Sequence, residues 1–370
     1  MTGDDRPAAP PTPLWVRRAL QLAASLLVAG SAVWLLRAAA LPIAPPAESF
    51  SRVRWWTVAG YLVLWSGVHV LRALRWRWLL DPLANVPLRR VLAASFVGFA
   101  AIALLPLRTG EAVRPLLVRT RELSGWAATG TIAAERIIDG LFLSGMLLAG
   151  LFASRPLDPL PDHIGDLPIS AAVVPTAAYA ALALFAVAFL LMGLFYARRD
   201  VARSLTERVV GLVSPALARW LAARVEHVAS GLGFLPNFAV TSRFVALTAV
   251  YWLVNSAASW LVGWGAGIDG FSYAEACVTT GVVALGILTP NAPGFFGAYQ
   301  FSFYAALAVY YPRDVVVGPG AALVLLVYAS QMGITLAFAL LGAALDPGGT
   351  RAALTAEDDA EKLPSGGASG

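Results

Sequence analysis

Residues 91–119 read VLAASFVGFAAIALLPLRTGEAVRPLLVR, and this stretch decides how the chain can fold. Its first part, residues 91–107, is apolar enough to enter a membrane and ends beside a proline. Arg108, Glu111 and Arg114 then follow at close spacing. The fold must therefore place several charges at the edge of a bilayer or inside it.

The composition is that of an integral membrane protein. Of 370 residues, 58% are hydrophobic and 13% are charged, whereas soluble domains are about 45–50% apolar and about 25% charged. The longest mostly polar stretches are a predicted loop over residues 72–90 and the C-terminal tail, so we expect no separate water-soluble domain. The chain has one cysteine, Cys277, and three histidines without ligand spacing, so we expect no metal and no cofactor.

Six apolar runs are long enough to cross a hydrocarbon core of about 30 Å. They cover residues 19–37, 55–71, 127–152, 171–196, 244–264 and 321–345. Two further runs, 91–107 and 276–311, are ambiguous, and TPNAPGFFG at residues 289–297 breaks the second. We therefore predict an all-α polytopic membrane domain over residues 19–345, preceded by a disordered cytoplasmic N-terminus at 1–18.

The distribution of arginines predicts how these runs are oriented, because arginine-rich loops stay in the cytoplasm. Residues 72–125 carry nine arginines and residues 197–243 carry seven, so both segments should be cytoplasmic, as should both termini. Run 91–107 then begins and ends on the cytoplasmic side, and run 276–311 does so on the outer side. We predict two re-entrant helical hairpins, the first turning near Pro106; the alternative is eight spanning helices.

The two predicted hairpins resemble each other in sequence. GFAAIALLP at residues 98–106 and GVVALGILTP at residues 281–290 share a glycine, an apolar run and a final proline. Each follows a helix that contains tryptophan and precedes a spanning helix, and the two lie in opposite orientation. Either this is an inverted repeat, with a substrate site at the interface of broken helices, or two apolar runs ending in proline look alike by chance.

Two segments outside the apolar runs have distinct compositions. In residues 201–232, apolar residues recur with helical spacing on one face and charged residues fall elsewhere, which indicates an amphipathic segment in the inner interface of the membrane. The tail over residues 346–370 is rich in glycine, alanine and acidic residues. We expect this tail to be disordered.

The charges after the first predicted turn need an explanation. Gly110 allows the chain to change direction, and Glu111 favours the first turn of a helix over residues 111–119. Arg108 and Arg114 would flank a position for a phosphate. The alternative is a cytoplasmic loop with an ordinary glutamate–arginine pair.

Five further charges lie within or beside apolar helices. Arg72 and Arg75 follow the second apolar run, where arginines either anchor the inner leaflet or line a site. Glu135 and Asp139 share a helix face, with Arg136 within reach of Asp139. An ionised group at the bilayer centre costs about 2.5–3.5 kcal/mol on insertion scales. These residues therefore mark a pathway or site, or a structural ion-pair cluster that ties helices together.

The late segment TPNAPGFFGAYQ interrupts an apolar run with helix-breaking residues. Pro290, Gly294 and Gly297 leave backbone groups free at membrane depth, and Gln300 adds a polar side chain. The two glycines line a site or allow close helix packing. Together with the charges, this pattern suits an anionic lipid headgroup, because guanidinium groups pair bidentately with phosphate. The carboxylates suit cation or proton coupling, a cationic headgroup, or neutralisation of the arginines.

In this order and over residues 20–345, these groups resemble the flippase-like family, also called the lysylphosphatidylglycerol synthase transmembrane region, which is the membrane half of bacterial multiple peptide resistance factors. The motifs that carry the resemblance are Arg72 and Arg75; Pro106, Arg108, Gly110, Glu111 and Arg114; Glu135, Arg136 and Asp139; and Pro290, Gly294 and Gly297. The late family motif often ends in glutamate, whereas this chain has Gln300, which puts coupling through that position in question. No stretch is long enough for the aminoacyl-transfer domain of those factors, so we expect no lysine transfer from tRNA.

Three functions are consistent with these features. The resemblance implies a multi-pass translocase of the bacterial plasma membrane that moves a phospholipid or a polyprenyl-phosphate-linked lipid between leaflets. Its partners would be lipids with anionic or zwitterionic headgroups, and no nucleic acid. The alternatives are an intramembrane enzyme that acts on a lipid phosphate, for which we find no catalytic constellation, and a non-transporting membrane partner of an envelope-biosynthesis enzyme. We favour the translocase and expect no enzymatic activity.

Overall fold

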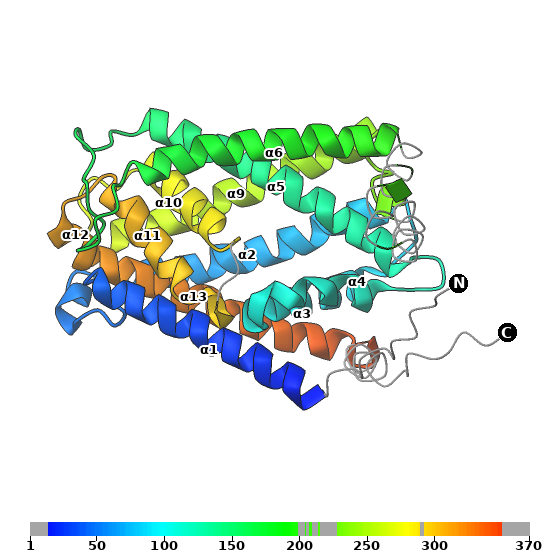
Figure 1. Cartoon of the computed structure of the whole chain (residues 1–370), viewed down its shortest axis with the longest axis horizontal. Helices are drawn as coiled ribbons and strands as arrows, with labels where there is room; N and C mark the ends of the chain where they lie inside the picture. Colours follow the sequence, from blue (N-terminus) through cyan, green and yellow to red (C-terminus); the bar gives the residue numbers. More distant parts are fainter. Residues whose placement is uncertain are drawn as a thin grey trace, which may run out of the picture.

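The computed structural model describes residues 14–198, 204, 207–208, 214, 228–288 and 292–349. This part of the chain is helical and contains no strand. Within the described residues, five helices are long and apolar enough to cross a membrane: α2 (Trp55–Leu80), α5 (Gly125–Ala153), α6 (Val173–Ala197), α9 (Phe238–Gly265) and α13 (Pro319–Leu345). The 25-residue α1 (Leu14–Ala38) lies alongside them (Figure 1). The prediction of an all-α polytopic membrane protein is confirmed.

Helix α2 extends well beyond the predicted apolar run. The sequence analysis placed a polar loop over residues 72–90, but α2 continues to Leu80 and carries Arg72 and Arg75 inside the bundle. The prediction of this loop was wrong over residues 72–80, because the Arg75 side chain pairs with acidic groups of another helix and is fully buried; residues 81–87 do form a connection between α2 and the next helix. Acidic side chains of α5, and not water, compensate the charge of Arg75.

The first ambiguous run forms a re-entrant hairpin. Helix α3 (Leu88–Leu104) ends at an extended residue, Leu105, and the chain returns through the 3₁₀ helix η2 (Pro106–Ala112) and the short α4 (Val113–Val118). The α-helix therefore begins at Val113 and not at Glu111 as predicted. The turn requires Gly110 for close approach, because a Cβ there would lie 2.2 Å from the Ala101 backbone.

The second ambiguous run forms the matching hairpin. Helix α10 (Tyr273–Gly286), the 3₁₀ turn η3 (Pro293–Phe295) and α11 (Ala298–Ala308) follow one another. Gly294 and Gly297 have φ values of 75° and 87°, which favour glycine. The Gln300 side chain accepts a hydrogen bond from the Gly297 N–H at 2.7 Å and so caps α11. Pro290 lies outside the described residues.

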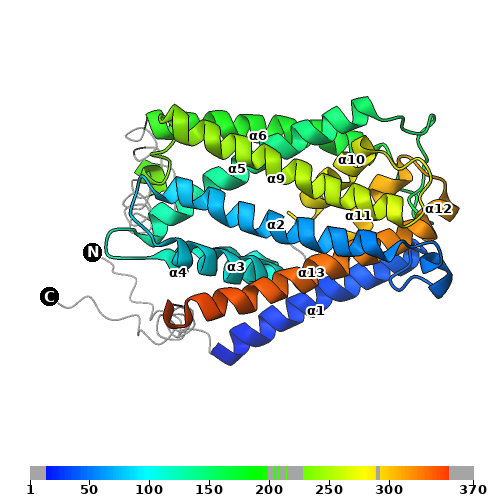
Figure 2. The same ribbon diagram turned by 180° about the vertical axis from the view of Figure 1, so that it is seen from behind.

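The two halves of the chain pack reciprocally. Helix α2 packs along α9, while α3 of the first half packs on α13 of the second and α10 of the second half packs on α5 of the first. The hairpins α3–α4 and α10–α11 enter the bundle from opposite ends (Figures 1 and 2). Each hairpin thus contacts the last long helix of the other half, as in an inverted repeat.

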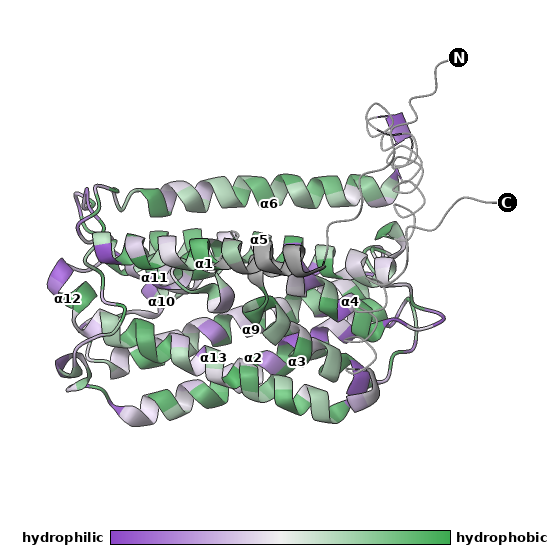
Figure 3. Cartoon of the chain, turned by 60° about the horizontal axis from the view of Figure 1, so that its bottom comes forward, coloured by the Kyte–Doolittle hydropathy of each residue, from purple (hydrophilic) through white to green (hydrophobic). Residues whose placement is uncertain are grey.

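The remaining elements lie around this framework. Helix α6 has few buried residues and is hydrophobic along its length (Figure 3), as expected for a helix that faces lipid. It contacts α5 where Phe185 lies over Gly140, at which a Cβ would come within 2.2 Å of that ring. The short η1 (Ala47–Phe50) lies between α1 and α2, and the short α12 (Arg313–Val317) lies between α11 and α13. Most of the predicted amphipathic segment 201–232 and of the tail 346–370 lies outside the described residues.

Candidate functional site

A buried ion-pair cluster joins α2, α4 and α5. Arg75 donates to both carboxylate oxygens of Asp139, each at 2.6 Å, and to the Thr248 hydroxyl of α9 at 2.7 Å. Its second terminal nitrogen also donates to Glu135 at 3.1 Å. The bidentate geometry is the strongest that an arginine and a carboxylate can form.

Glu135 is held from a second side by the first hairpin. Arg114 of α4 donates to both of its carboxylate oxygens, at 3.2 and 3.0 Å. The Arg114 guanidinium also lies over the Trp76 ring, 4.2 Å from its centroid. Gly98 of α3 makes room for this arginine, because a Cβ at that position would lie 2.2 Å from Arg114 Cγ. Both carboxylate oxygens of Glu135 therefore accept hydrogen bonds from arginines, and the residue is buried.

Arg136 forms a separate pair with the turn of the hairpin. It donates to the Glu111 carboxylate at 3.1 Å, and both side chains remain partly exposed. The sequence analysis placed Arg136 within reach of Asp139 on the same helix, whereas the structure pairs it with Glu111 across two elements. This pair ties the tip of the first hairpin to α5.

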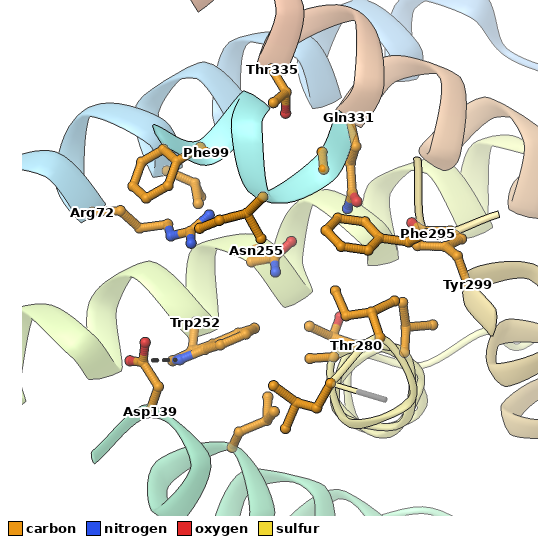
Figure 4. A pocket seen from close by; sticks show the side chains of 18 of the residues that line it. Arg72, Phe99, Asp139, Trp252, Asn255, Thr280, Phe295, Tyr299, Gln331 and Thr335 are labelled. Atoms are coloured by element: carbon orange, nitrogen blue, oxygen red, sulfur yellow. Dashed lines mark hydrogen bonds between the residues drawn. The ribbon is translucent and has the colours of Figure 1, made fainter. Parts of the chain in front are cut away.

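These pairs border a cavity of about 390 Å³ between the two halves of the bundle. Figure 4 shows Arg72 and Asp139 at one side of it and Phe295 and Tyr299 at the other, with Asn255 between them. Trp252 donates to Asp139 at 3.4 Å along the wall. The charged residues that line the cavity are Arg72, Glu111, Arg136 and Asp139. Most of the remaining lining is apolar or aromatic, which is typical of a ligand site with a few placed polar groups.

Arg72 differs from the other arginines of the cluster. Its guanidinium lies 4.1 Å from the centroid of the Phe99 ring. No hydrogen bond or ion pair links it to a described residue, although Asp139 and Glu111, which both have arginine partners, line the same cavity. The described cluster thus holds four guanidinium groups and three carboxylates, which leaves one positive charge, at Arg72, without a carboxylate.

A second pocket of about 260 Å³ adjoins the cavity. The two share Ala103, Met332 and Thr335 as lining residues. The second pocket also touches Leu104 at the end of α3 and Leu336 of α13, which are 49% and 44% exposed on the apolar surface of the bundle. The second pocket therefore lies between the charged cavity and exposed apolar side chains of α3 and α13.

The structure separates the predicted site residues into two groups. Arg72, Glu111, Arg136 and Asp139 line the cavity, whereas Arg75, Arg114 and Glu135 lie behind its wall and hold the helices together. Arg114 was expected to flank a position for a phosphate, and Glu135 to mark a pathway or to belong to a structural ion-pair cluster; neither lines the cavity. Gly110, Gly297 and Gln300 shape the hairpins, while Gly294 lines the second pocket. The side chain of Arg108 and all of Pro290 lie outside the described residues.

Sequence reasoning missed the contribution of α9. Trp252, Asn255 and Ser259 line the cavity, and Thr248 of the same helix binds Arg75. These four positions recur at intervals of four, three and four residues, which places them on one helix face. That stripe of polar residues and tryptophan in an otherwise apolar run was the available indication. Thr280 of α10 completes this polar wall.

The comparisons with known proteins gave one match. The family model described as the lysylphosphatidylglycerol synthase TM region matches residues 22–339. No curated protein and no solved structure matches the chain. Among the described residues, no group of three or more histidine, cysteine, aspartate or glutamate side chains is placed to hold a metal ion.

Proposed function

The chain belongs to the lysylphosphatidylglycerol synthase transmembrane region family, and we propose that it moves an anionic lipid between membrane leaflets by way of the cavity at Arg72. Family membership relates the chain to membrane proteins of lipid modification or translocation. The observation that carries the proposal is the Arg72 guanidinium, which lines the cavity without a carboxylate partner. Asp139 and Glu111 line the same cavity but are paired with Arg75 and Arg136.

The charge balance favours an anion as the ligand. An uncompensated arginine at membrane depth is unfavourable by about 2.5–3.5 kcal/mol on insertion scales. A phosphate that binds Arg72 would neutralise this charge, and a guanidinium matches the geometry of phosphate oxygens. The paired carboxylates leave neither Glu135 nor Asp139 free to bind a cation, so neutralisation of the arginines is the role that the geometry supports for them.

The adjoining pocket gives the acyl or prenyl chain a place. A translocated lipid must shelter its headgroup while its chains stay in hydrocarbon. The second pocket adjoins the cavity and is also lined by two exposed apolar side chains, Leu104 and Leu336. In this arrangement a lipid holds its phosphate at Arg72 while its chains remain beside α3 and α13.

We also propose that the protein lies in the bacterial plasma membrane with both termini in the cytoplasm.

Headgroup flipping in proteoliposomes tests this proposal, with fluorescent anionic phospholipid and a reductant that bleaches only the outer leaflet. Arg72→Gln removes the unpaired charge, and Arg77→Gln is the control, because Arg77 lies on the same helix but is exposed and pairs with Asp81. We expect Arg72→Gln to slow flipping at least about tenfold, which corresponds to about 1.4 kcal/mol, and Arg77→Gln to leave it near wild type. Equal rates for wild type and Arg72→Gln would overturn the proposal.

The same preparation separates the alternative functions. An enzyme acting on a lipid phosphate would produce a lipid of changed mass, which mass spectrometry of the vesicles detects. We expect the lipid mass to stay unchanged. A non-transporting scaffold for an envelope-biosynthesis enzyme would show background flipping in wild type and in Arg72→Gln alike, together with co-purification of a fixed partner.

A further inference from the structure

The cavity contains a second polar region that no ion pair explains. Trp65 of α2, Asn255 of α9 and Thr280 of α10 line it and are 8%, 6% and 7% exposed. The indole Nε1 of Trp65, the amide Oδ1 of Asn255 and the hydroxyl of Thr280 have no hydrogen-bond partner. Buried polar groups normally have one. Three residues of this kind line one cavity, which makes their polar groups candidates for contact with a polar ligand.

This region lies beside the Arg72 guanidinium, toward the outer end of the bundle. Trp65 precedes Arg72 by seven residues, which is about 10 Å along α2. Asn255 follows Thr248 by the same number of residues on the antiparallel α9, and Thr248 binds Arg75 one turn below Arg72. Figure 4 shows the Arg72 side chain directed toward Asn255, with Thr280 beyond it. A single ligand can therefore reach both Arg72 and these groups.

The hydrogen-bonding character of the three groups determines which ligand atoms can bind them. The indole N–H only donates, the amide oxygen only accepts, and the threonine hydroxyl does both. A ligand hydroxyl satisfies all of them, because it also donates and accepts. An ammonium group has no acceptor for Trp65, and a carboxylate has no donor for Asn255. No described carboxylate beside them is unpaired, since Asp139 and Glu111 have arginine partners.

We infer that the transported lipid carries, beyond its phosphate, an uncharged hydroxylated group such as glycerol or a sugar, which binds Trp65, Asn255 and Thr280. This inference rests on the proposed function, because it identifies the headgroup of the same lipid. The phosphate binds Arg72, and the hydroxyl groups extend about one to two helical turns outward. The ammonium of a cationic aminoacyl or ethanolamine headgroup has donors for Asn255 and Thr280 but no acceptor for the Trp65 N–H.

Flipping of four lipids with the same acyl chains tests the inference: phosphatidylglycerol, phosphatidylinositol, phosphatidic acid and phosphatidylethanolamine. We expect the two hydroxylated lipids to be flipped at least about tenfold faster than the other two. The variant Thr280→Val keeps the side-chain shape and removes the hydroxyl, and should reduce this preference severalfold. Thr279→Val is the matched control, because the adjacent hydroxyl already donates to the Glu275 carbonyl and does not line the cavity.

The outcomes distinguish the two proposals. If wild type flips all four lipids at one rate, or if Thr280→Val keeps the wild-type preference, the polar groups hold only water and the inference is overturned. The Arg72 mechanism would survive that result, provided that Arg72→Gln still slows every anionic lipid. If wild type flips none of the four lipids above background, the proposed function fails and this inference fails with it.

Discussion

Arg75 and Asp139 form a bidentate ion pair between α2 and α5, with both N···O distances at 2.6 Å. Asp139 lines the cavity, yet its charge is held by an arginine behind the wall. The pair therefore has two consequences: it fixes α2 against α5, and it removes a negative charge from the cavity. The positive character of the cavity then depends on Arg72.

The first prediction concerns the pair between Arg114 and Glu135. Glu135→Gln leaves Arg75 and Arg114 with one carboxylate, Asp139, between them. Breaking a buried pair in this way costs about 3–5 kcal/mol, so we expect the free energy of unfolding in bicelles to fall by about that amount. The loss should be measured against Arg77→Gln, which disrupts an exposed pair and should change stability by less than about 1 kcal/mol.

The double variant Arg114→Met with Glu135→Met provides the decisive comparison. It removes one positive and one negative charge, and it leaves Arg75 paired with Asp139 in a neutral site. Apolar replacement of a whole buried pair is often close to neutral. We expect the double variant to be more stable than either of the single variants Arg114→Met and Glu135→Met. A loss equal to the sum of the two single losses would show that the residues do not act as a pair.

How far the sequence predicts this structure depends on the kind of feature. The long apolar runs and the two interrupted ones predict the spanning helices and hairpins, because length and proline placement are local properties. The end of α2 was misplaced, because Arg75 enters the bundle only when Asp139 is there to receive it. The sequence analysis gave Arg72 and Arg75 the same interpretation, as arginines that anchor the inner leaflet or line a site. Only the structure shows that one faces the cavity and the other lies behind it.

The partners of the acidic residues could not be predicted either. Arg136 lies three residues before Asp139 on α5, but Glu111 at the hairpin tip is the carboxylate that it contacts. Such pairing depends on how α4 and η2 fold back onto α5, which helical spacing does not contain. The polar face of α9 is predictable from the sequence, because Thr248, Asn255 and Ser259 repeat with helical spacing. They were passed over because none of them is charged.

The second prediction concerns the close packing of the first hairpin. Gly110→Ala adds a Cβ that would lie 2.2 Å from the Ala101 backbone, which cannot rotate away as a side chain can. Overpacking of this kind typically costs about 1–3 kcal/mol. We expect a lower melting temperature and slower flipping, because the tip carries Glu111. Gly67→Ala is the control, since nothing lies within 4 Å of that added Cβ; equal behaviour of the two variants would contradict the packing of the turn.

The third prediction concerns the orientation of the two halves. In a Cys277→Ala background, single cysteines are placed at Glu122, in the loop between α4 and α5, and at Asp269, in the loop between α9 and α10. Both positions are exposed, and the two loops lie at opposite ends of the bundle (Figure 1). A membrane-impermeant maleimide should label Asp269→Cys in intact cells and Glu122→Cys only after permeabilisation. Labelling of both from the same side would contradict the inverted arrangement of the hairpins.

The central claim is that Arg72 binds the phosphate of a lipid inside the cavity, and a cryo-EM structure in nanodiscs rich in phosphatidylglycerol tests it most directly. We predict density for one headgroup in the cavity, with a phosphate oxygen at about 2.7–2.9 Å from the Arg72 guanidinium. The Arg72→Gln protein, prepared in the same nanodiscs, should lack this density. Headgroups ordered only at the surface arginines, with a water-filled cavity in both proteins, would contradict the account.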